Sequence, residues 1–307
     1  MKIVSMQEIN ARIRLDPQAF VRQVDAEFAD LIRVMAEDIQ SHAEERPIIL
    51  LSGPSGSGKT SSARMLEMFL DQAGCETHTL SMDNYFSPFT PEELELVSQG
   101  KIDLESPDRL DITFLNEQLS DILACRPVEL PKYDFVESKR VPLGQTLTRK
   151  PGELVLLEGI HALNPDVISI PEETTSRLYV SVRTRIDLGE NLLLPRQMRL
   201  LRRMLRDKRG RARSFAETLE MFDKVEAGET KYIMPYKPRA THELDTFHAY
   251  EIAVYRTMIE QHLSELNDID RLSDLKLLMD LAEPLNEDIV PQASLIREFI
   301  GNSLFTD

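Results

Sequence analysis

The stretch PIILLSGPSGSGKTSSARML, residues 47–66, decides the fold of this chain. Four consecutive apolar residues near its start predict a buried strand, and the segment after the glycine-rich run predicts a helix. Gly53, Gly58, Lys59 and Thr60 satisfy the pattern G-x-x-x-x-G-K-[ST], in which backbone N–H groups at a helix N-terminus converge on phosphate oxygens. Strand, loop and helix in this order predict a P-loop nucleotide-binding fold.

Each position of this loop has a chemical role if it holds a nucleotide. Lys59 would neutralise the terminal phosphate oxygens, and Thr60 would offer its hydroxyl to Mg²⁺. The alternative is an accidental glycine-rich turn, which the flanking strand and helix disfavour. The predicted nucleotide contacts are Gly53, Pro54, Ser55, Gly56, Ser57, Gly58, Lys59, Thr60 and Ser61.

Composition limits what the remaining residues can do. The chain has 307 residues, 42% hydrophobic and 29% charged, with a net charge of -16. This charge repels nucleic-acid backbones and anionic lipid, so we expect no nucleic-acid partner and no membrane association. No apolar run approaches the roughly 20 residues that cross a bilayer, and the first residues lack a signal-peptide core, so a cytoplasmic location is expected. Cys75 and Cys125 are expected to be buried reduced thiols.

Short apolar runs alternate with helical stretches after residue 46. The runs are PIILLS, THTLSM, PVELP, ELVLLEG and RLYVSV. Strands separated by helices predict a three-layer α/β fold of the P-loop NTPase type, with a mostly parallel central sheet. Residues 46–240 are expected to form this domain, including an arginine-rich helical lid at about 196–215.

Helical additions are predicted at both ends of the chain. Over residues 17–44, Asp16 is the expected N-cap and Pro17 lies in the first turn. The expected apolar face is Phe20, Val24, Phe28, Leu31, Met35 and Ile39. We expect an N-terminal helical extension, 1–45, and a C-terminal helical region, 241–307, packed on the central domain and including a helix over 248–266. These extensions would cover sheet edges or mediate self-association into a homo-oligomer.

Two carboxylates follow predicted strands. Glu158 comes after four apolar residues and is predicted to hold Mg²⁺, while Asp83 follows the second strand and is predicted to accept a proton from an attacking hydroxyl. The alternatives are a strand-ending turn at Glu158 and an Asx-turn at Asp83. The chain has no N-K-x-D element that reads guanine and no D-E pair that activates water, which favours a kinase over a GTPase or mechanical ATPase.

Residues 196–213 form a basic block inside this acidic chain. They include nine Arg or Lys and one Asp. On a helix, Arg196, Arg199, Arg203 and Arg206 would form one cationic face, followed by a mobile segment DKRGRAR, as in a lid that closes on phosphates. The alternatives are a solvated helix paired with acidic residues and a nucleic-acid patch.

The runs GPSGSGKT, LSMDNYF, LESPDRLD, PKYDFVESKR, VLLEGI and RLLRRMLRDKRGRAR occur in this order. Together they resemble the uridine kinase branch of the phosphoribulokinase and uridine kinase family. The resemblance implies ATP and Mg²⁺ as cofactors and a small-molecule acceptor, with Asp83 as catalytic base toward a nucleoside 5′-hydroxyl. It further implies catalytic roles for Lys59 and Arg206, Mg²⁺ binding by Thr60 and Glu158, and a phosphate contact from Arg211.

The resemblance also implies an acceptor pocket, although this chain departs from the family pattern there. The implied pocket residues are Glu105, Tyr133, Phe135, Ile160, Arg203 and Arg213. Glu105 stands where the family has Asp, while Ser138 and Met221 stand where it has a base-reading His and Gln. A nucleoside, another small alcohol such as a sugar phosphate or a pantothenate-like compound, and a nucleotide-binding regulatory module without turnover therefore all remain open.

Overall fold

The computed structural model describes residues 2–260, residue 262 and residues 273–305. Its centre is a five-stranded sheet whose neighbouring strands all run parallel, in the spatial order β10-β7-β2-β6-β3. The strands are β2 (Ile48–Ser52), β3 (Thr77–Ser81), β6 (Leu154–Glu158), β7 (Thr175–Ser181) and β10 (His242–Asp245). The predicted mostly parallel sheet is confirmed.

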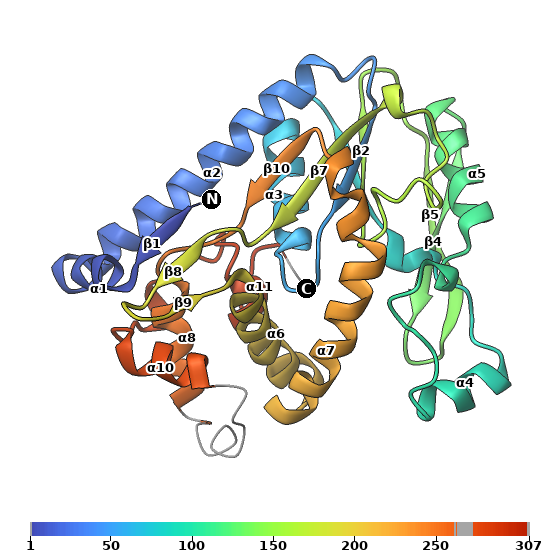
Figure 1. Ribbon diagram of the computed structural model, residues 1–307. Helices are drawn as coiled ribbons and strands as arrows, with labels where there is room; N and C mark the ends of the chain where they lie inside the picture. Colours follow the sequence, from blue (N-terminus) through green and yellow to red (C-terminus); the bar gives the residue numbers. More distant parts are fainter. Residues whose placement is uncertain (1, 261, 263–272, 306–307) are drawn as a thin grey trace.

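Helices cover this sheet and extend from it (Figure 1). In the described part of the chain, no helix combines the length and the apolar character needed to cross a membrane. The principal helices are α1 (Met6–Leu15), α2 (Pro17–Ser41), α3 (Lys59–Gln72), α4 (Pro91–Ser98), α5 (Ile112–Leu123), α6 (Pro195–Arg211), α7 (Phe215–Tyr232), α8 (Glu251–Glu260), α10 (Ser273–Leu281) and α11 (Arg297–Ile300).

Strand β2 divides the interior into two cores. Ile49 and Leu51 pack in one core with apolar residues of α2 and α3. Ile48 and Leu50 pack in the other core with residues of α5. Successive residues of a strand point to opposite faces, so a strand covered on both sides needs an uninterrupted apolar run. The three-layer α/β fold is therefore confirmed.

Helix α2 begins where the sequence predicts. The Asp16 side chain accepts a hydrogen bond from the N–H of Ala19 at 2.9 Å, which caps the helix, and the helix ends at Ser41. Four of the six predicted face residues are buried, but Leu31 is 56% exposed. The buried stripe instead passes through Ile32 and Ala36, because a four-residue step from Phe28 also follows the helical repeat.

One predicted strand belongs to a different sheet. The run PVELP lies in β4 (Val128–Asp134), which pairs antiparallel with β5 (Lys139–Leu147) in a two-stranded hairpin. Its placement in the parallel sheet is wrong, because four residues connect β4 to β5 and so short a link permits only antiparallel pairing. Strand β10, with the polar sequence HELD, completes the parallel sheet and carried no apolar signal.

Segments outside the central sheet join distant parts of the chain. Strand β1 (Ile3–Ser5) pairs parallel with β8 (Arg185–Asp187), and β9 (Leu192–Leu193) pairs antiparallel with β8.

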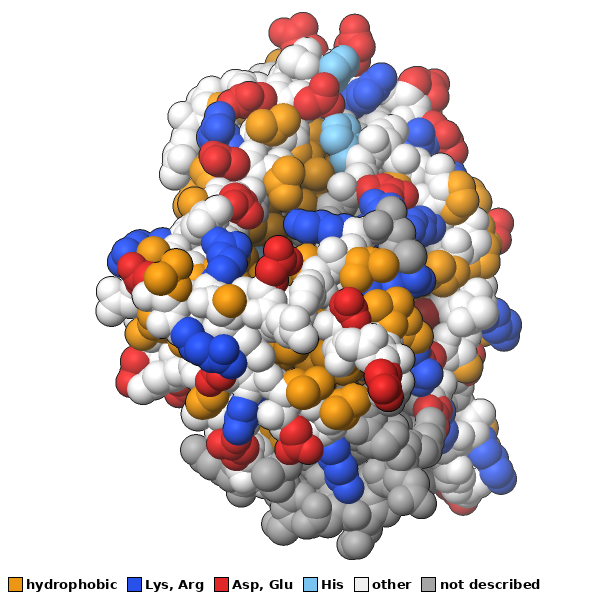
Figure 2. Space-filling model, turned by 60° about the vertical axis from the view of Figure 1, so that its left-hand side comes forward, with side chains coloured by type: hydrophobic (Ala, Val, Ile, Leu, Met, Phe, Trp, Pro, Cys, Tyr) orange, Lys and Arg blue, Asp and Glu red, His pale blue; other side chains and the backbone are white. Residues whose placement is uncertain are grey.

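The predicted helix over 248–266 is confirmed over α8, while residues 261 and 263–266 lie outside the described residues. Figure 2 shows one face of the molecule, on which basic, acidic and apolar side chains are interspersed.

A buried ion pair joins helix α6 to helix α8. The Arg202 guanidinium donates to both carboxylate oxygens of Glu251, at 2.7 and 3.0 Å, and both side chains are 0% exposed. Arg202 also donates to the carbonyl of Thr246 at 2.7 Å and to that of Gly56 at 3.3 Å. The pair therefore holds the lid helix against the phosphate loop and the end of β10.

We expect Arg202→Met to lower the free energy of unfolding by about 3–5 kcal/mol, because it leaves the Glu251 charge buried without a partner. The matched control is Arg196→Met, which breaks a pair with Glu226 in which the Arg196 side chain is 51% exposed. This control should cost less than about 1 kcal/mol. Urea unfolding of both variants measures the difference, and equal losses would contradict the role assigned to Arg202.

Candidate active site

The phosphate loop connects β2 to α3 and requires glycine at two positions. A Cβ atom at Gly53 would lie 2.0 Å from the carbonyl oxygen of Val180, so no side chain fits there. Gly58 has φ +83°, in the left-handed region that favours glycine. The loop is therefore a tight backbone turn that leads directly into the N-terminus of α3.

Lys59 spans this loop. Its ammonium donates to the carbonyl oxygen of Pro54 at 3.1 Å, and the side chain of the neighbouring Thr60 is exposed. Backbone N–H groups at a helix start and a lysine within the loop are the groups that bind phosphate. The loop thus brings one cation, one free hydroxyl and several N–H donors to the same end of the sheet.

Two carboxylates lie beside the loop because their strands are parallel neighbours. Glu158 is the last residue of β6 and pairs in register with Ser81, the last residue of β3. The Ser81 hydroxyl donates to Glu158 at 2.8 Å and accepts a weaker bond from the N–H of Asp83 at 3.4 Å. The structure therefore brings together Lys59, Asp83 and Glu158, which the sequence placed more than 20 residues apart.

The charges of these groups are unbalanced. Burial, and to a smaller extent the nearby Asp83, raise the pKa of Glu158 to about 7, although Lys59 opposes the shift. The Asp83 side chain is exposed to solvent, and desolvation by the surrounding protein raises its pKa, while Lys59 and Arg211 oppose this shift. Carboxylates with too little neighbouring positive charge suit a hard divalent cation, so Glu158 and Thr60 fit the oxygen ligands of Mg²⁺.

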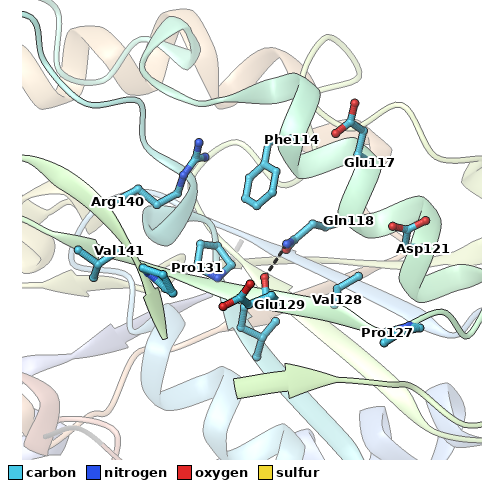
Figure 3. Close-up of a pocket in the computed structure, with 12 residues that line it drawn as sticks. Phe114, Glu117, Gln118, Asp121, Pro127, Val128, Glu129, Pro131, Arg140 and Val141 are labelled. Carbon is cyan, nitrogen blue, oxygen red and sulfur yellow. Dashed lines mark hydrogen bonds between the residues drawn. The ribbon is translucent and has the colours of Figure 1, made fainter. Parts of the chain in front are cut away.

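A hydrogen-bond chain fixes the segment that carries Asp83. The Tyr85 hydroxyl donates to the Gln118 side chain at 2.8 Å. The Gln118 amide in turn donates to the carbonyl of Glu129 at 2.7 Å, the bond that Figure 3 marks. These two hydrogen bonds connect the short helix Met82–Tyr85 to α5 and to β4. Beside it lies a hollow of about 440 Å³ that no residue of the phosphate loop lines. Gln118 therefore orients the Asp83 segment from outside the site.

The predicted aromatic wall is only partly open. Tyr133 and Phe135 form an edge-to-face cluster with Phe86, with ring centroids 5.0–6.1 Å apart. Phe135 is 62% exposed, whereas Tyr133 is 5% exposed. Ile160 packs against the core on the α5 side of the sheet. Phe86 follows Asp83 by three residues, which places the aromatic cluster near this carboxylate. Because Phe135 is the exposed ring of the cluster, it is the one that a flat ligand can reach.

A second hollow, of about 470 Å³, lies between α7 and the segment after α4. Two of the six predicted acceptor-pocket residues, Glu105 and Arg203, line it together with Met221, whereas the other four, Tyr133, Phe135, Ile160 and Arg213, do not. The sequence reasoning did not find the three lysines that also line it, Lys101, Lys224 and Lys231. For Lys224 and Lys231 the signal was their spacing from Met221 and Gly228, which places these four residues on one face of a helix.

The lid arginines converge on one acid that the sequence reasoning also missed. Asp207 is fully buried, and four arginines have side-chain nitrogens within 3.0–3.6 Å of its carboxylate. The sequence feature that could have indicated Asp207 is that it is the single acidic residue within the basic block 196–213. The four partners are Arg203, Arg206, Arg211 and Arg213. These residues, predicted to contact substrate and phosphate, are therefore held as a cluster.

The predicted cationic face of residues 196–206 is wrong in part. Arg196 and Arg199 pair with Glu226 and Glu229 of α7, and the Arg199 side chain is only 10% exposed. They join α6 to α7 rather than facing a ligand, since α7 supplies the neutralising carboxylates. The segment DKRGRAR is also not a loose extension, because α6 continues to Arg211.

Comparison with known proteins identifies the family. The family model described as "Phosphoribulokinase / Uridine kinase family" matches residues 48–252. Uridine kinase of Lactobacillus johnsonii is 30% identical over 181 residues, which span 58% of this chain and 76% of that protein. Uridine-cytidine kinase 2-B of Danio rerio is 28% identical over 187 residues, spanning 59% of this chain and 66% of that protein.

A solved structure shares the fold at low sequence identity. YFH7 of Saccharomyces cerevisiae, a candidate P-loop-containing kinase with a circular permutation, has a TM-score of 0.50 and 12% identity. The match covers 71% of this chain and 98% of that one. The resemblance drawn from the motifs is confirmed, since the family model covers more than half of the chain. The chain therefore belongs to the phosphoribulokinase and uridine kinase family of phosphotransferases.

Proposed function

We propose that this chain transfers the γ-phosphate of ATP, with Mg²⁺, to the 5′-hydroxyl of a nucleoside. The observation that carries the proposal is the meeting of Lys59, Asp83 and Glu158 at the carboxyl ends of neighbouring parallel strands. Relatives named uridine kinase support the nucleoside, as does the exposed ring of Phe135 near the Asp83 segment. Phosphoryl transfer depends mainly on positioning and on charge stabilisation, which these groups supply.

The residues divide the work of the reaction. Lys59 and the loop N–H groups would hold the phosphates, and Arg206 and Arg211 would stabilise charge on the transferring group. Asp83 would accept a hydrogen bond from the acceptor hydroxyl and take its proton as the oxygen attacks phosphorus. Thr60 and Glu158 would hold Mg²⁺, which would supply positive charge next to the phosphates.

A second acceptor class has its own support. The hollow beside Glu105 is lined by four cationic side chains and two carboxylates. Lys101 and Lys224 have exposed side chains at this hollow, in a chain whose net charge is -16. This excess of local positive charge suits an alcohol that carries a phosphate or carboxylate group.

The proposal predicts that Asp83→Asn lowers kcat by roughly 10²- to 10⁴-fold, because the amide cannot take the hydroxyl proton. Purified protein is incubated with ATP, Mg²⁺ and two panels, nucleosides and phosphorylated or carboxylated alcohols, and products are detected by mass. Asp30→Asn, on the exposed surface of α2, is the control with the same charge change. ADP release that does not depend on any acceptor would contradict a kinase. ATP binding without any product would favour the regulatory module.

The second acceptor class predicts a selective effect of Lys224→Ala. Removing this ammonium should raise KM about tenfold for an anionic alcohol, because a charge-assisted contact is lost. KM for a neutral nucleoside should stay unchanged, since no charge is being matched. Steady-state kinetics with both acceptor types measures the difference, and an equal rise in both would argue against anion binding in this hollow.

The Glu158 pKa predicts a pH dependence of stability in protein kept metal-free with a chelator. Its pKa of about 7 in the folded state exceeds the usual carboxyl value, so the folded state retains a proton that the unfolded state has lost. Between about pH 4.5 and 7, stability attributable to this group should fall as pH rises, by roughly 2 kcal/mol after allowance for partial exposure. Tm of the protein and of Glu158→Gln across this range tests it, and the same slope in both would contradict the assignment.

A further inference from the structure

A C-terminal segment lies against the phosphate loop. We define it as residues 291–305, which follow the family-matched region and include α11. Figure 1 shows α11 between α3 and α6. The sequence predicted only that the C-terminal region packs on the central domain. Its contacts with the loop raise a question about how a nucleotide enters.

The decisive contact is made by Glu298. Its Oε2 accepts a hydrogen bond from the backbone N–H of Ser61 at 3.2 Å and another from the Ser61 hydroxyl at 2.8 Å. Ser62 begins the helical pattern by donating to the carbonyl of Gly58, so the Ser61 N–H is one of the free donors at the start of α3. Such donors in a phosphate loop bind phosphate oxygens. A carboxylate oxygen therefore occupies a position suited to a phosphate oxygen.

Other residues of the C-terminal segment flank the same loop. A Cβ atom at Gly58 would lie 2.9 Å from a methyl carbon of Leu295, so this side chain covers the glycine. Farther along, Leu304 and Phe305 share a hollow of about 650 Å³ with Thr60 and residues of α3. The segment thus runs along the side of the loop from which a ligand bound at the start of α3 would extend.

The residues just before Glu298 are anchored away from the phosphate loop. The Ser294 hydroxyl donates to Asp25 of α2 at 2.9 Å and contacts the Tyr250 hydroxyl at 2.7 Å. Arg297 donates to the carbonyl oxygens of Glu287 and Val290 at 2.8 and 2.6 Å. Because its neighbours are anchored elsewhere, Glu298 can leave Ser61 by turning its side chain or by a small shift of α11.

We propose that the C-terminal segment is a built-in competitor of the donor nucleotide, with Glu298 occupying the Ser61 donors that a phosphate of ATP would take. The inference rests on the proposed use of ATP. Two anionic oxygens cannot accept the same N–H at full strength, and their charges repel each other. Binding of ATP and the Glu298–Ser61 contact therefore exclude each other, so loss of this contact accompanies filling of the donor site.

The test measures nucleotide affinity on the full chain. Calorimetry with Mg²⁺ and a non-hydrolysable ATP analogue compares wild type with Glu298→Gln, whose neutral side chain competes less strongly with phosphate. We expect the variant to bind about tenfold more tightly. Asp288→Asn removes the same charge from an exposed side chain shortly before the segment and should bind as wild type does.

The outcomes separate this inference from the proposed function. Equal affinity of wild type and Glu298→Gln, with phosphotransfer intact, would overturn the inference and leave the kinase in place. Weaker binding by the variant would also overturn it, because Glu298 would then belong to the donor site. Binding that Lys59→Ala does not weaken would place the nucleotide away from the loop and remove both proposals.

Discussion

The buried pair of Arg202 and Glu251 is the contact on which the site depends. One guanidinium binds a carboxylate, the carbonyl of Thr246 after β10 and the carbonyl of Gly56 in the phosphate loop, and it lies 4.9 Å from the ring of Phe299. The lid helix, the loop, the sheet edge and the C-terminal segment therefore share one fixed point. Since a charge inside a protein must keep its partners, none of these parts can move far from this point independently.

The same need for charge balance organises the rest of the site. A chain with a net charge of -16 attracts anions only where cations are concentrated. Carboxylates bind several of the donors and cations around the loop. Asp207 holds the lid arginines, Glu229 accepts from the N–H of Ser55 at 3.1 Å, and Glu298 accepts from Ser61. In the proposed function, nucleotide binding is therefore an exchange of anions, in which the affinity depends on how firmly each carboxylate is held.

Structural features that depend on residues close in the sequence could be predicted, whereas features that depend on contacts with residues far away in the sequence could not. The apolar run of β2, the glycines of the loop and the Asp16 cap each reflect a requirement met within a few residues. The positions of Asp83 and Glu158 followed from one further rule, that parallel strands end at the same edge. By contrast, the helical spacing of Arg199 predicts a ligand-facing arginine, but Glu229, 30 residues away, pairs with it and neutralises its charge. Strand β10 is polar and is recognisable only beside β7.

The two terminal extensions act on the family core together. Helix α2 packs on α3 behind the sheet, and its Asp38 accepts a contact from His242 of the edge strand β10 at 2.8 Å. Asp25 of the same helix holds Ser294, four residues before Glu298. Covering the sheet edge does not by itself account for the contact between Asp25 and Ser294. Because α2 anchors the segment that carries Glu298, the N-terminal helix contributes to the stability of the Glu298–Ser61 contact, which is the contact that ATP displaces in the proposed competition.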